Sequence, residues 1–323
     1  MRMKKFFLFI VLNILSLGVF SQVQTDSLFS SSEIVLKTSN GDIFGTLTMP
    51  DNSKSAPIIL IVPGSGPTDR DCNSPLGIQT NAFKMLSGDL AKKGISTLRF
   101  DKRGIGKSKP AMASESELRF ETYINDVTAW VSLLKSDKRF SSVIILGHSE
   151  GSLIGMIAAE RNNVAGFISI SGVGKSADKV LQEQLKTKLP PQLLEESNKI
   201  LDSLKIGKTV STVNPNLIAL YRPSVQPYMI SWIKYNPSTE ISKLRIPVLI
   251  IQGTTDLQVT VDNSKLLLEA KPDAKLLIIE NMNHVLKDAD SDIQKNLATY
   301  RNPALPLKAG LVDGIVDYVK NRK

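Results

Sequence analysis

The sequence is poor in the residue types that build disulfides and zinc sites. Its 323 residues include one cysteine, Cys72, and two histidines, His148 and His284. A single cysteine excludes an internal disulfide, and the lack of a cysteine and histidine cluster argues against a zinc site. Nothing in the sequence around Cys72 suggests a base that would activate its thiol, so a cysteine nucleophile is disfavoured.

Charge of one sign is not concentrated in the body of the chain. The formal net charge is +9, and Arg2, Lys4 and Lys5 contribute to it at the N-terminus. The other lysines are scattered and mostly interleaved with acidic residues, a pattern typical of a solvated surface. We therefore expect no nucleic-acid partner. With 42% hydrophobic and 22% charged residues, the composition is that of a globular protein with a large core.

A hydrophobic run without charge occupies residues 6–20, directly after the basic start. About 15 residues are few for spanning a bilayer. The run ends at Val19-Phe20-Ser21, which resembles a small-residue cleavage site. These features predict a secretory signal peptide over residues 1–21, with an uncleaved membrane anchor as the alternative. We expect an exported protein, periplasmic or secreted, without stable membrane insertion after cleavage.

Strand and helix patterns alternate after residue 21. Asn40-Gly41 between two alternating segments predicts a β-hairpin over residues 33–50. Further strands are predicted in APIILIV, ISTLRFD, VIIL, AGFISIS, IPVLIIQG and AKLLIIE, and helices at residues 81–93, 121–135, about 150–160, 261–270 and about 309–321. This alternation indicates a parallel sheet with crossover helices.

The alternation stops near Gly174 and resumes with IPVLIIQG. Between them lies an amphipathic helical pattern broken by Pro190-Pro191, followed by a proline-rich stretch. We interpret residues 175–241 as an inserted helical cap. Residues 22–174 and 242–323 then form the two parts of one α/β core.

The motif Gly147-His148-Ser149-Glu150-Gly151 stands where a predicted strand meets a predicted helix. The two glycines occupy positions at which side chains would collide if the turn were sharp. This is the context of a nucleophile elbow, which exposes a serine hydroxyl at the tip of a strand. We predict that Ser149 is a nucleophile and that the backbone N–H of Glu150 faces the developing oxyanion.

A serine nucleophile needs a base, and the chain offers two histidines. His148 belongs to the turn itself, where we expect its side chain to point away into the sheet and to pack. His284 follows a late strand, at the edge where parallel sheets build their sites, so we predict that it is the base. Asp256 follows the preceding strand and is predicted to orient the imidazole. Asp262 is the alternative, although it lies where the next helix is expected to start and suits a cap.

The order Ser149, Asp256, His284, together with VPGSGPTDRD, LRFDKRGIGKS and QGTTD, resembles the α/β-hydrolase superfamily, and its esterase-like members in particular. The resemblance covers nearly the whole chain after residue 21. It implies an α/β-hydrolase fold, with a mostly parallel central sheet and helices on both faces. It also implies a second oxyanion donor, which is the backbone N–H of Ser65 here. Pro63 replaces the histidine of many relatives, a change that a backbone donor tolerates.

Charged residues beside these motifs have open roles. Asp69-Arg70-Asp71 follows the oxyanion loop and could touch a substrate, although an ion-pair network within the loop is the commoner role. Residues 101–106 correspond to a loop that buttresses the site in the family. The side chain of Glu150 could bind a substrate cation or hydrogen-bond the oxyanion loop.

These features predict a serine hydrolase that cleaves carboxylic esters of small to medium size, with no metal or organic cofactor. Four residues of the cap could line an acyl pocket, or could pack the cap onto the sheet: Tyr221, Tyr228, Met229 and Trp232. A serine peptidase and a thioesterase or acyltransferase are alternatives on the same triad. A non-catalytic ligand-binding protein is the alternative from another class. The expected partner is a small-molecule ester, and the sequence gives no indication of the oligomeric state.

Overall fold

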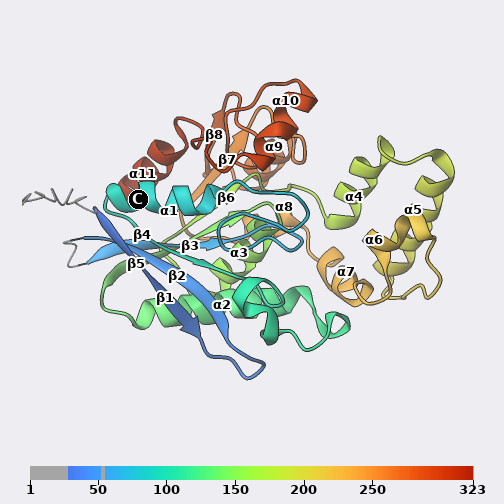
Figure 1. Ribbon diagram of the computed structural model, residues 1–323, viewed down its shortest axis with the longest axis horizontal. Helices are drawn as coiled ribbons and strands as arrows, with labels where there is room; N and C mark the ends of the chain where they lie inside the picture. Colours follow the sequence, from blue (N-terminus) through green and yellow to red (C-terminus); the bar gives the residue numbers. More distant parts are fainter. Residues whose placement is uncertain (1–27, 52–54, 323) are drawn as a thin grey trace, which may run out of the picture.

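The structure is a computed structural model that describes residues 28–51 and 55–322. The predicted signal peptide, residues 1–21, lies outside the described residues. Within them, an eight-stranded sheet runs through the centre of the molecule (Figure 1). In spatial order its strands are β1 (Phe29–Leu36), β2 (Ile43–Pro50), β4 (Ser96–Phe100), β3 (Ala56–Val62), β5 (Phe140–His148), β6 (Gly166–Ile170), β7 (Val248–Gly253) and β8 (Lys275–Ile279).

The sheet is antiparallel at one side and parallel over the rest. β1 and β2 form the predicted hairpin, and Gly41 turns it with φ of 114°, a conformation that glycine adopts at little cost. β2 is also antiparallel to β4, whereas the remaining neighbours are parallel. β3 and β7 are almost entirely buried, because parallel strands are covered on both faces. The predicted mostly parallel sheet is confirmed.

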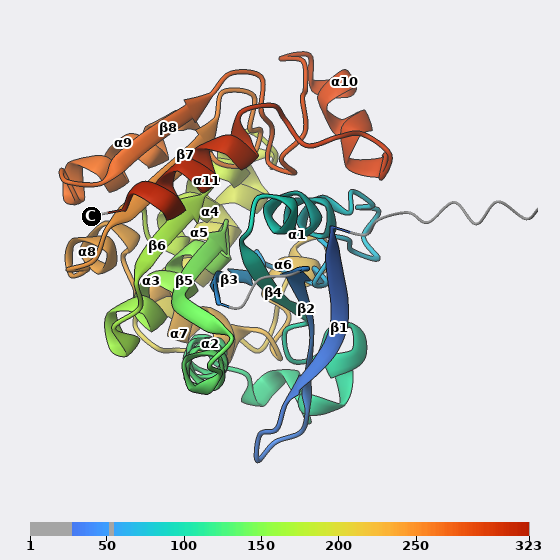
Figure 2. The same ribbon diagram turned by 90° about the vertical axis from the view of Figure 1, so that its left-hand side faces the viewer.

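Helices cover both faces of the sheet (Figure 2). One face carries α1 (Ala82–Lys92) and α11 (Leu311–Asn321), and the other carries α2 (Phe120–Ser136), α3 (Glu150–Asn162) and α9 (Val261–Ala270). In α2, four apolar residues spaced three or four apart are buried against the sheet: Ile124, Val127, Val131 and Leu134. Each helix therefore turns its apolar face to the sheet, as the sequence periodicity predicts.

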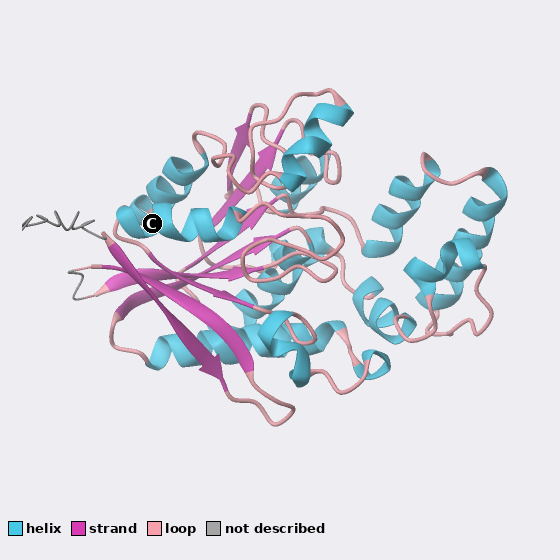
Figure 3. Cartoon of the chain, in the orientation of Figure 1, coloured by secondary structure: helices cyan, strands magenta, loops and turns pink. Residues whose placement is uncertain are grey.

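The helices of the predicted insertion stand apart from the sheet at one end of the molecule (Figures 1 and 3). They are α4 (Ala177–Lys186), α5 (Pro191–Lys205), α6 (Ile218–Tyr221) and α7 (Gln226–Ile233). They share a small core of their own, which includes Leu201, Leu204 and Tyr221. α7 contacts α2 and so docks this cap onto the core. α8 (Pro237–Ser242) begins within the predicted residues 175–241 but packs against α3 and α9 of the core.

Short helices complete the described chain: η1 (Gly106–Ala111), η2 (Glu115–Glu117), η3 (Pro215–Leu217), α10 (Ile293–Ala298) and η4 (Thr299–Arg301). η2 lies against α7 of the cap. Across residues 28–51 and 55–322, no helix combines the length and the apolar character needed to cross a membrane.

Candidate active site

Ser149 occupies the sharp turn between β5 and α3. Its backbone has φ of 55° and ψ of −123°, a conformation that costs a residue with a Cβ on the order of 1–3 kcal/mol. A Cβ at Gly147 would lie 2.2 Å from the carbonyl oxygen of Gly151, and one at Gly151 would lie 2.3 Å from that of Val62. Both glycines are therefore required for the turn, and the half-buried Ser149 is presented at the end of β5.

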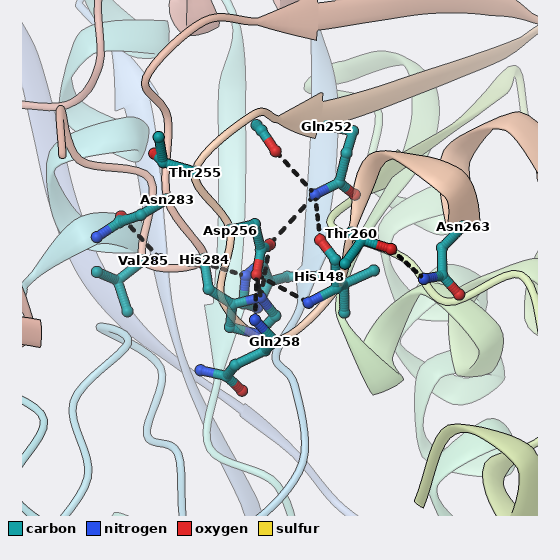
Figure 4. A network of polar contacts seen from close by, with 12 residues as sticks. His148, Gln252, Thr255, Asp256, Gln258, Thr260, Asn263, Asn283, His284 and Val285 are labelled. Atoms are coloured by element: carbon teal, nitrogen blue, oxygen red, sulfur yellow. Dashed lines mark hydrogen bonds and ion pairs between the residues drawn. The ribbon is translucent and has the colours of Figure 1, made fainter. Parts of the chain in front are cut away.

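His284 and Asp256 are joined by hydrogen bonds (Figure 4). The imidazole Nδ1 of His284 lies 2.8 Å from Oδ2 and 3.1 Å from Oδ1 of Asp256. Because an ionised carboxylate only accepts hydrogen bonds, Nδ1 carries the hydrogen and Nε2 is left as the acceptor. The pair therefore holds the tautomer that can remove a proton from a hydroxyl.

Asp256 is held by the turn that follows β7. Its Oδ1 accepts hydrogen bonds from the backbone N–H groups of Gln258, at 2.8 Å, and Val259, at 2.9 Å. Burial raises the pKa of Asp256, but the charge of His284 and the hydrogen bonds from His284 and these N–H groups outweigh burial and hold that pKa below its usual value. Asp262, the alternative, lies in the first turn of α9 and pairs with Lys265 at the surface.

His148 does not point away from the site as expected. Its ring packs against the ring of His284, with 4.7 Å between centroids, and edge-on against Phe83. Its Nε2 lies 2.8 Å from the carbonyl oxygen of His284 and must donate, since a carbonyl only accepts. Burial, followed by the charge of His284, lowers the pKa of His148 to about 3. His148 is thus a neutral brace for the backbone of His284.

Ser149 and His284 are brought to the same edge of the sheet but are not hydrogen-bonded. Within the described chain, no hydrogen bond joins Ser149 Oγ to His284. His148 connects them: it precedes Ser149 in the chain, and its ring packs against the ring of His284. Catalytic hydrogen bonds are often long in unliganded sites and tighten when substrate binds.

The two predicted oxyanion donors border one cavity. Ser65 follows β3, Glu150 begins α3, and both line a cavity of about 310 Å³ together with Ser149 and Gly66. Gly64 allows the loop to approach the elbow closely, because a Cβ there would lie 3.1 Å from the Cβ of Ser149. The loop after β3 and the start of α3 therefore meet beside the serine.

The side chain of Glu150 is buried and fully engaged. Its Oε1 accepts a hydrogen bond of 2.7 Å from the hydroxyl of Tyr228, and its Oε2 lies 3.3 Å from Nζ of Lys102. Burial and the charge of Glu150 hold the pKa of Tyr228 well above its usual value, so the hydroxyl remains a donor. Nζ of Lys102 also donates to the carbonyl oxygen of Gly64 at 2.6 Å. Glu150 thus reaches the oxyanion loop through Lys102.

Lys102 is the residue that sequence reasoning missed. Lysine is rarely buried, and in LRFDKRGIGKS it stands beside Asp101, which looks like its partner. Its position directly after β4, at the carboxyl edge of the sheet, is the signal that could have found it. Asp101 and Arg103 turn elsewhere, to Arg70 and Asp126 respectively.

The charged residues beside the oxyanion loop form ion pairs with one another. Arg70 pairs with Asp101 at 2.7 Å, and Arg99 pairs with Asp71. Asp101 also accepts a hydrogen bond from the backbone N–H of Lys107. These contacts place the Asp69-Arg70-Asp71 segment in a network that fastens the loop to β4.

The cap closes the cavity opposite Ser149. The predicted residues Tyr228, Met229 and Trp232 all line it. Tyr221 does not, because it is fully buried in the cap, where its hydroxyl lies 2.7 Å from that of Ser197. The other cap residues that line the cavity are mostly apolar: Ala177, Val180, Leu181, Gln184, Ala219, Leu220, Arg222 and Val225. In the part of the chain that the structure describes, no group of three or more His, Cys, Asp or Glu side chains is arranged to hold a metal ion.

Known proteins resemble this chain in sequence and in fold. Residues 76–238, half of the chain, match the family described as serine aminopeptidase, S33. Esterase EstD from Thermotoga maritima is 31% identical over 250 residues. That alignment covers 75% of this chain and 57% of EstD, so the chain spans little more than half of that relative.

Solved structures share the fold at low sequence identity. Est1E from Butyrivibrio proteoclasticus has a TM-score of 0.57 at 17% identity, covering 90% of this chain and 99% of Est1E. A bromoperoxidase from Bacillus anthracis has a TM-score of 0.53 at 16% identity, covering 90% of this chain and 100% of its own. These likenesses confirm the predicted α/β-hydrolase fold.

Proposed function

Because the chain belongs to the S33 serine aminopeptidase family of α/β-hydrolases, we propose that it is a serine hydrolase acting on carboxylic esters of small to medium size. The observation that carries this proposal is the buried His284–Asp256 pair beside the strained turn of Ser149. The similarity to Esterase EstD supports the choice of ester.

In the first half of the reaction, Ser149 Oγ attacks the ester carbonyl carbon and its proton passes to Nε2 of His284. The backbone N–H groups of Ser65 and Glu150 stabilise the oxyanion of the tetrahedral intermediate. The bond to the leaving oxygen then breaks, and His284 returns the proton to the departing alcohol. Asp256 stabilises the imidazolium throughout and keeps its orientation.

In the second half, water replaces the alcohol. His284 removes a proton from the water as its oxygen attacks the acyl carbon, and the same two N–H groups stabilise the second oxyanion. The bond to Ser149 Oγ breaks, the serine regains its proton from His284, and the carboxylic acid leaves. The chain's own side chains and backbone account for every step.

The charges around the cavity favour a neutral substrate over the free amino group that an aminopeptidase binds. Among the described residues that line it, Glu150 is the one carboxylate. That carboxylate already contacts Tyr228 and Lys102 and is buried. A substrate ammonium would therefore be desolvated without a free partner, which is costly. The apolar cap residues instead suit an acyl chain.

Paired substrates test this assignment. We expect p-nitrophenyl butyrate to be hydrolysed with a kcat/KM at least about 100-fold above that of alanine p-nitroanilide, a difference of about 3 kcal/mol in transition-state binding. Ethyl butyrate, an ester without an activated leaving group, should also be cleaved. Faster turnover of the anilide would favour the peptidase alternative.

We also propose that the protein is exported and acts in the periplasm or outside the cell. The proposal rests on the basic start and the hydrophobic run of residues 6–20. Fractionation of expressing cells should place the protein outside the cytoplasm, with an N-terminus near Gln22. A cytoplasmic protein that retains Met1 would contradict it.

A further inference from the structure

The ammonium group of Lys102 contacts both segments that carry the predicted oxyanion donors. Its side chain is 2% exposed, and three groups of the protein surround Nζ. Nζ lies 2.6 Å from the Gly64 carbonyl oxygen, 3.3 Å from Glu150 Oε2 and 4.9 Å from the centre of the Tyr123 ring. A buried lysine is costly unless it is paired, so these contacts together explain how it is tolerated.

The bond to Gly64 bears on Ser65 because both groups belong to one peptide unit. The carbonyl of Gly64 and the N–H of Ser65 share a planar, trans peptide bond, so the two groups point in opposite directions. A cation that fixes the oxygen on one side therefore fixes the direction of the N–H on the other. Donation to the oxygen also polarises the unit and strengthens the N–H as a donor.

The loop that carries this peptide is fastened to β4 further along, by the ion pairs of Arg70 and Asp71, and the Thr68 hydroxyl donates to the carbonyl oxygen of Ser65 at 3.0 Å. Gly64 and Gly66 flank Ser65, and Gly66 has φ of 70° with nothing within 4 Å of an added Cβ. Ser65 itself is exposed. Glycines make such a loop conformationally free, so a short, charge-assisted hydrogen bond is an effective restraint on it.

The second contact of Lys102 leads to the other donor. Glu150 supplies its backbone N–H as the first residue of α3, and its side chain pairs with Lys102. The same carboxylate accepts the Tyr228 hydroxyl from the cap. One ion pair thus ties together the loop after β3, the start of α3 and helix α7.

We propose that Lys102 is a positioning residue for the oxyanion hole, which aims the Ser65 N–H at the reacting carbonyl by holding the Gly64 carbonyl oxygen. This inference rests on the proposed serine-hydrolase function. It predicts that loss of Lys102 weakens transition-state stabilisation while substrate binding is largely retained, because Lys102 itself does not line the cavity.

Lys102→Met keeps the length of the side chain and removes the ammonium group. We expect kcat for p-nitrophenyl butyrate to fall about 10–100-fold, less than the 10²–10³-fold typical for loss of a whole oxyanion donor. KM should stay within about threefold of wild type. The rate of Ser149 labelling by a fluorophosphonate should fall in parallel, since that attack also builds negative charge on an oxygen.

A double variant separates positioning from charge neutralisation. Lys102→Met leaves Glu150 buried without its cation, which could itself disturb the fold or the site. Lys102→Met/Glu150→Gln removes that unpaired charge and keeps an acceptor for Tyr228. If Lys102 acts on Gly64, kcat stays at least about 10-fold low in the folded double variant. Recovery to within about threefold of wild type would overturn the proposal.

Arg103→Met is the matched control for loss of a buried cation. Arg103 is adjacent and buried, and it also donates to a backbone carbonyl, but its partners are Asp126, Ala111 and Thr38. We expect a lower unfolding temperature with kcat within about threefold. An equal fall of kcat in both variants would show a general structural effect and overturn the proposal.

The same measurements separate failure of the inference from failure of the proposed function. If wild type is labelled but does not turn over the esters, the substrate assignment fails, and the labelling rates of the variants still test Lys102. If wild type is neither labelled nor active, the serine-hydrolase function and this inference fall together.

Discussion

At the scale of single residues, the two histidines differ in what their ring nitrogens contact. His284 keeps one ring nitrogen on Asp256 and the other free to accept a proton. His148 donates to the backbone of His284 and buries its remaining nitrogen, Nδ1, without a partner among the described residues. A buried imidazole of this kind is stable only when neutral, and that property gives stability a pH dependence.

We predict that His148 makes the folded protein less stable as the pH falls. Its pKa is about 3 in the folded protein and about 6.5 in an unfolded chain. Between these values the unfolded state binds the extra proton, so the free energy of unfolding decreases on acidification by about 1 kcal/mol per pH unit. His148 therefore does not lower the free energy of unfolding above about pH 6.5, and it lowers that free energy progressively below this pH.

His148→Gln provides the comparison. The amide of glutamine can still donate to the His284 carbonyl but does not titrate. Urea unfolding at pH 7, 6 and 5 should show a shallower pH dependence in the variant than in wild type, by about 1 kcal/mol per pH unit below pH 6.5. Parallel curves for the two proteins would contradict the assignment of this effect to His148.

Sequence reasoning located the local features of the candidate site and missed the contacts that the fold creates. Ser149, Asp256 and His284 each follow an apolar strand, a relation that is visible in the chain. Lys102 meets Gly64 and Glu150 only through tertiary structure. The direction of the His148 side chain likewise depends on where the loop of His284 lies, which sequence spacing does not reveal.

At the scale of elements, periodicity predicted the long helices and buried strands well. α2 and α9 match the predicted ranges to within a residue or so, because an amphipathic stripe persists through each. α10 was not predicted, since six residues are too short to show a period. The break at Pro190-Pro191 does separate α4 from α5, with Pro191 in the first turn of α5, where proline is favoured.

Helix α4 is predicted to limit the length of the acyl chain that the cavity accepts. Val180 lines the cavity from α4 and is half-buried. Val180→Phe should fill part of the space, so that kcat/KM for p-nitrophenyl octanoate falls at least about 10-fold while the acetate ester stays within about threefold. A fall of this size in kcat/KM is typical when an apolar pocket loses contact with one or a few methylene groups of the substrate.

Val180→Ala is the matched control, because it removes side-chain atoms at the same position and so enlarges the cavity. It should leave the acetate ester unchanged and should not reduce turnover of the octanoate ester. The two substitutions are compared by the ratio of kcat/KM for the two esters. An equal change for both esters in Val180→Phe would show that this side of the cavity does not hold the acyl chain.

At the scale of the whole molecule, the site lies where two separately packed parts meet. The core supplies Ser149, Asp256, His284 and the oxyanion loop, and the cap supplies most of the cavity wall. Hydrogen bonds join the two parts. The Tyr228 hydroxyl donates to Glu150, and Arg222 and Ser224 donate to Glu115 of η2. The fold thus separates the reaction machinery from the apolar surface that faces the substrate.

We propose that Ser149 is the nucleophile of a working serine hydrolase. The test treats the purified protein with a fluorophosphonate probe and follows the reaction by intact-protein mass spectrometry. Wild type should gain one phosphonyl group, located by peptide mapping on Ser149, and lose its esterase activity. The Ser149→Ala variant should gain none, provided that its unfolding temperature matches that of wild type and so shows that it is folded. Wild type that stays unlabelled, or Ser149→Ala that is labelled as fast as wild type, would show that Ser149 is not the nucleophile.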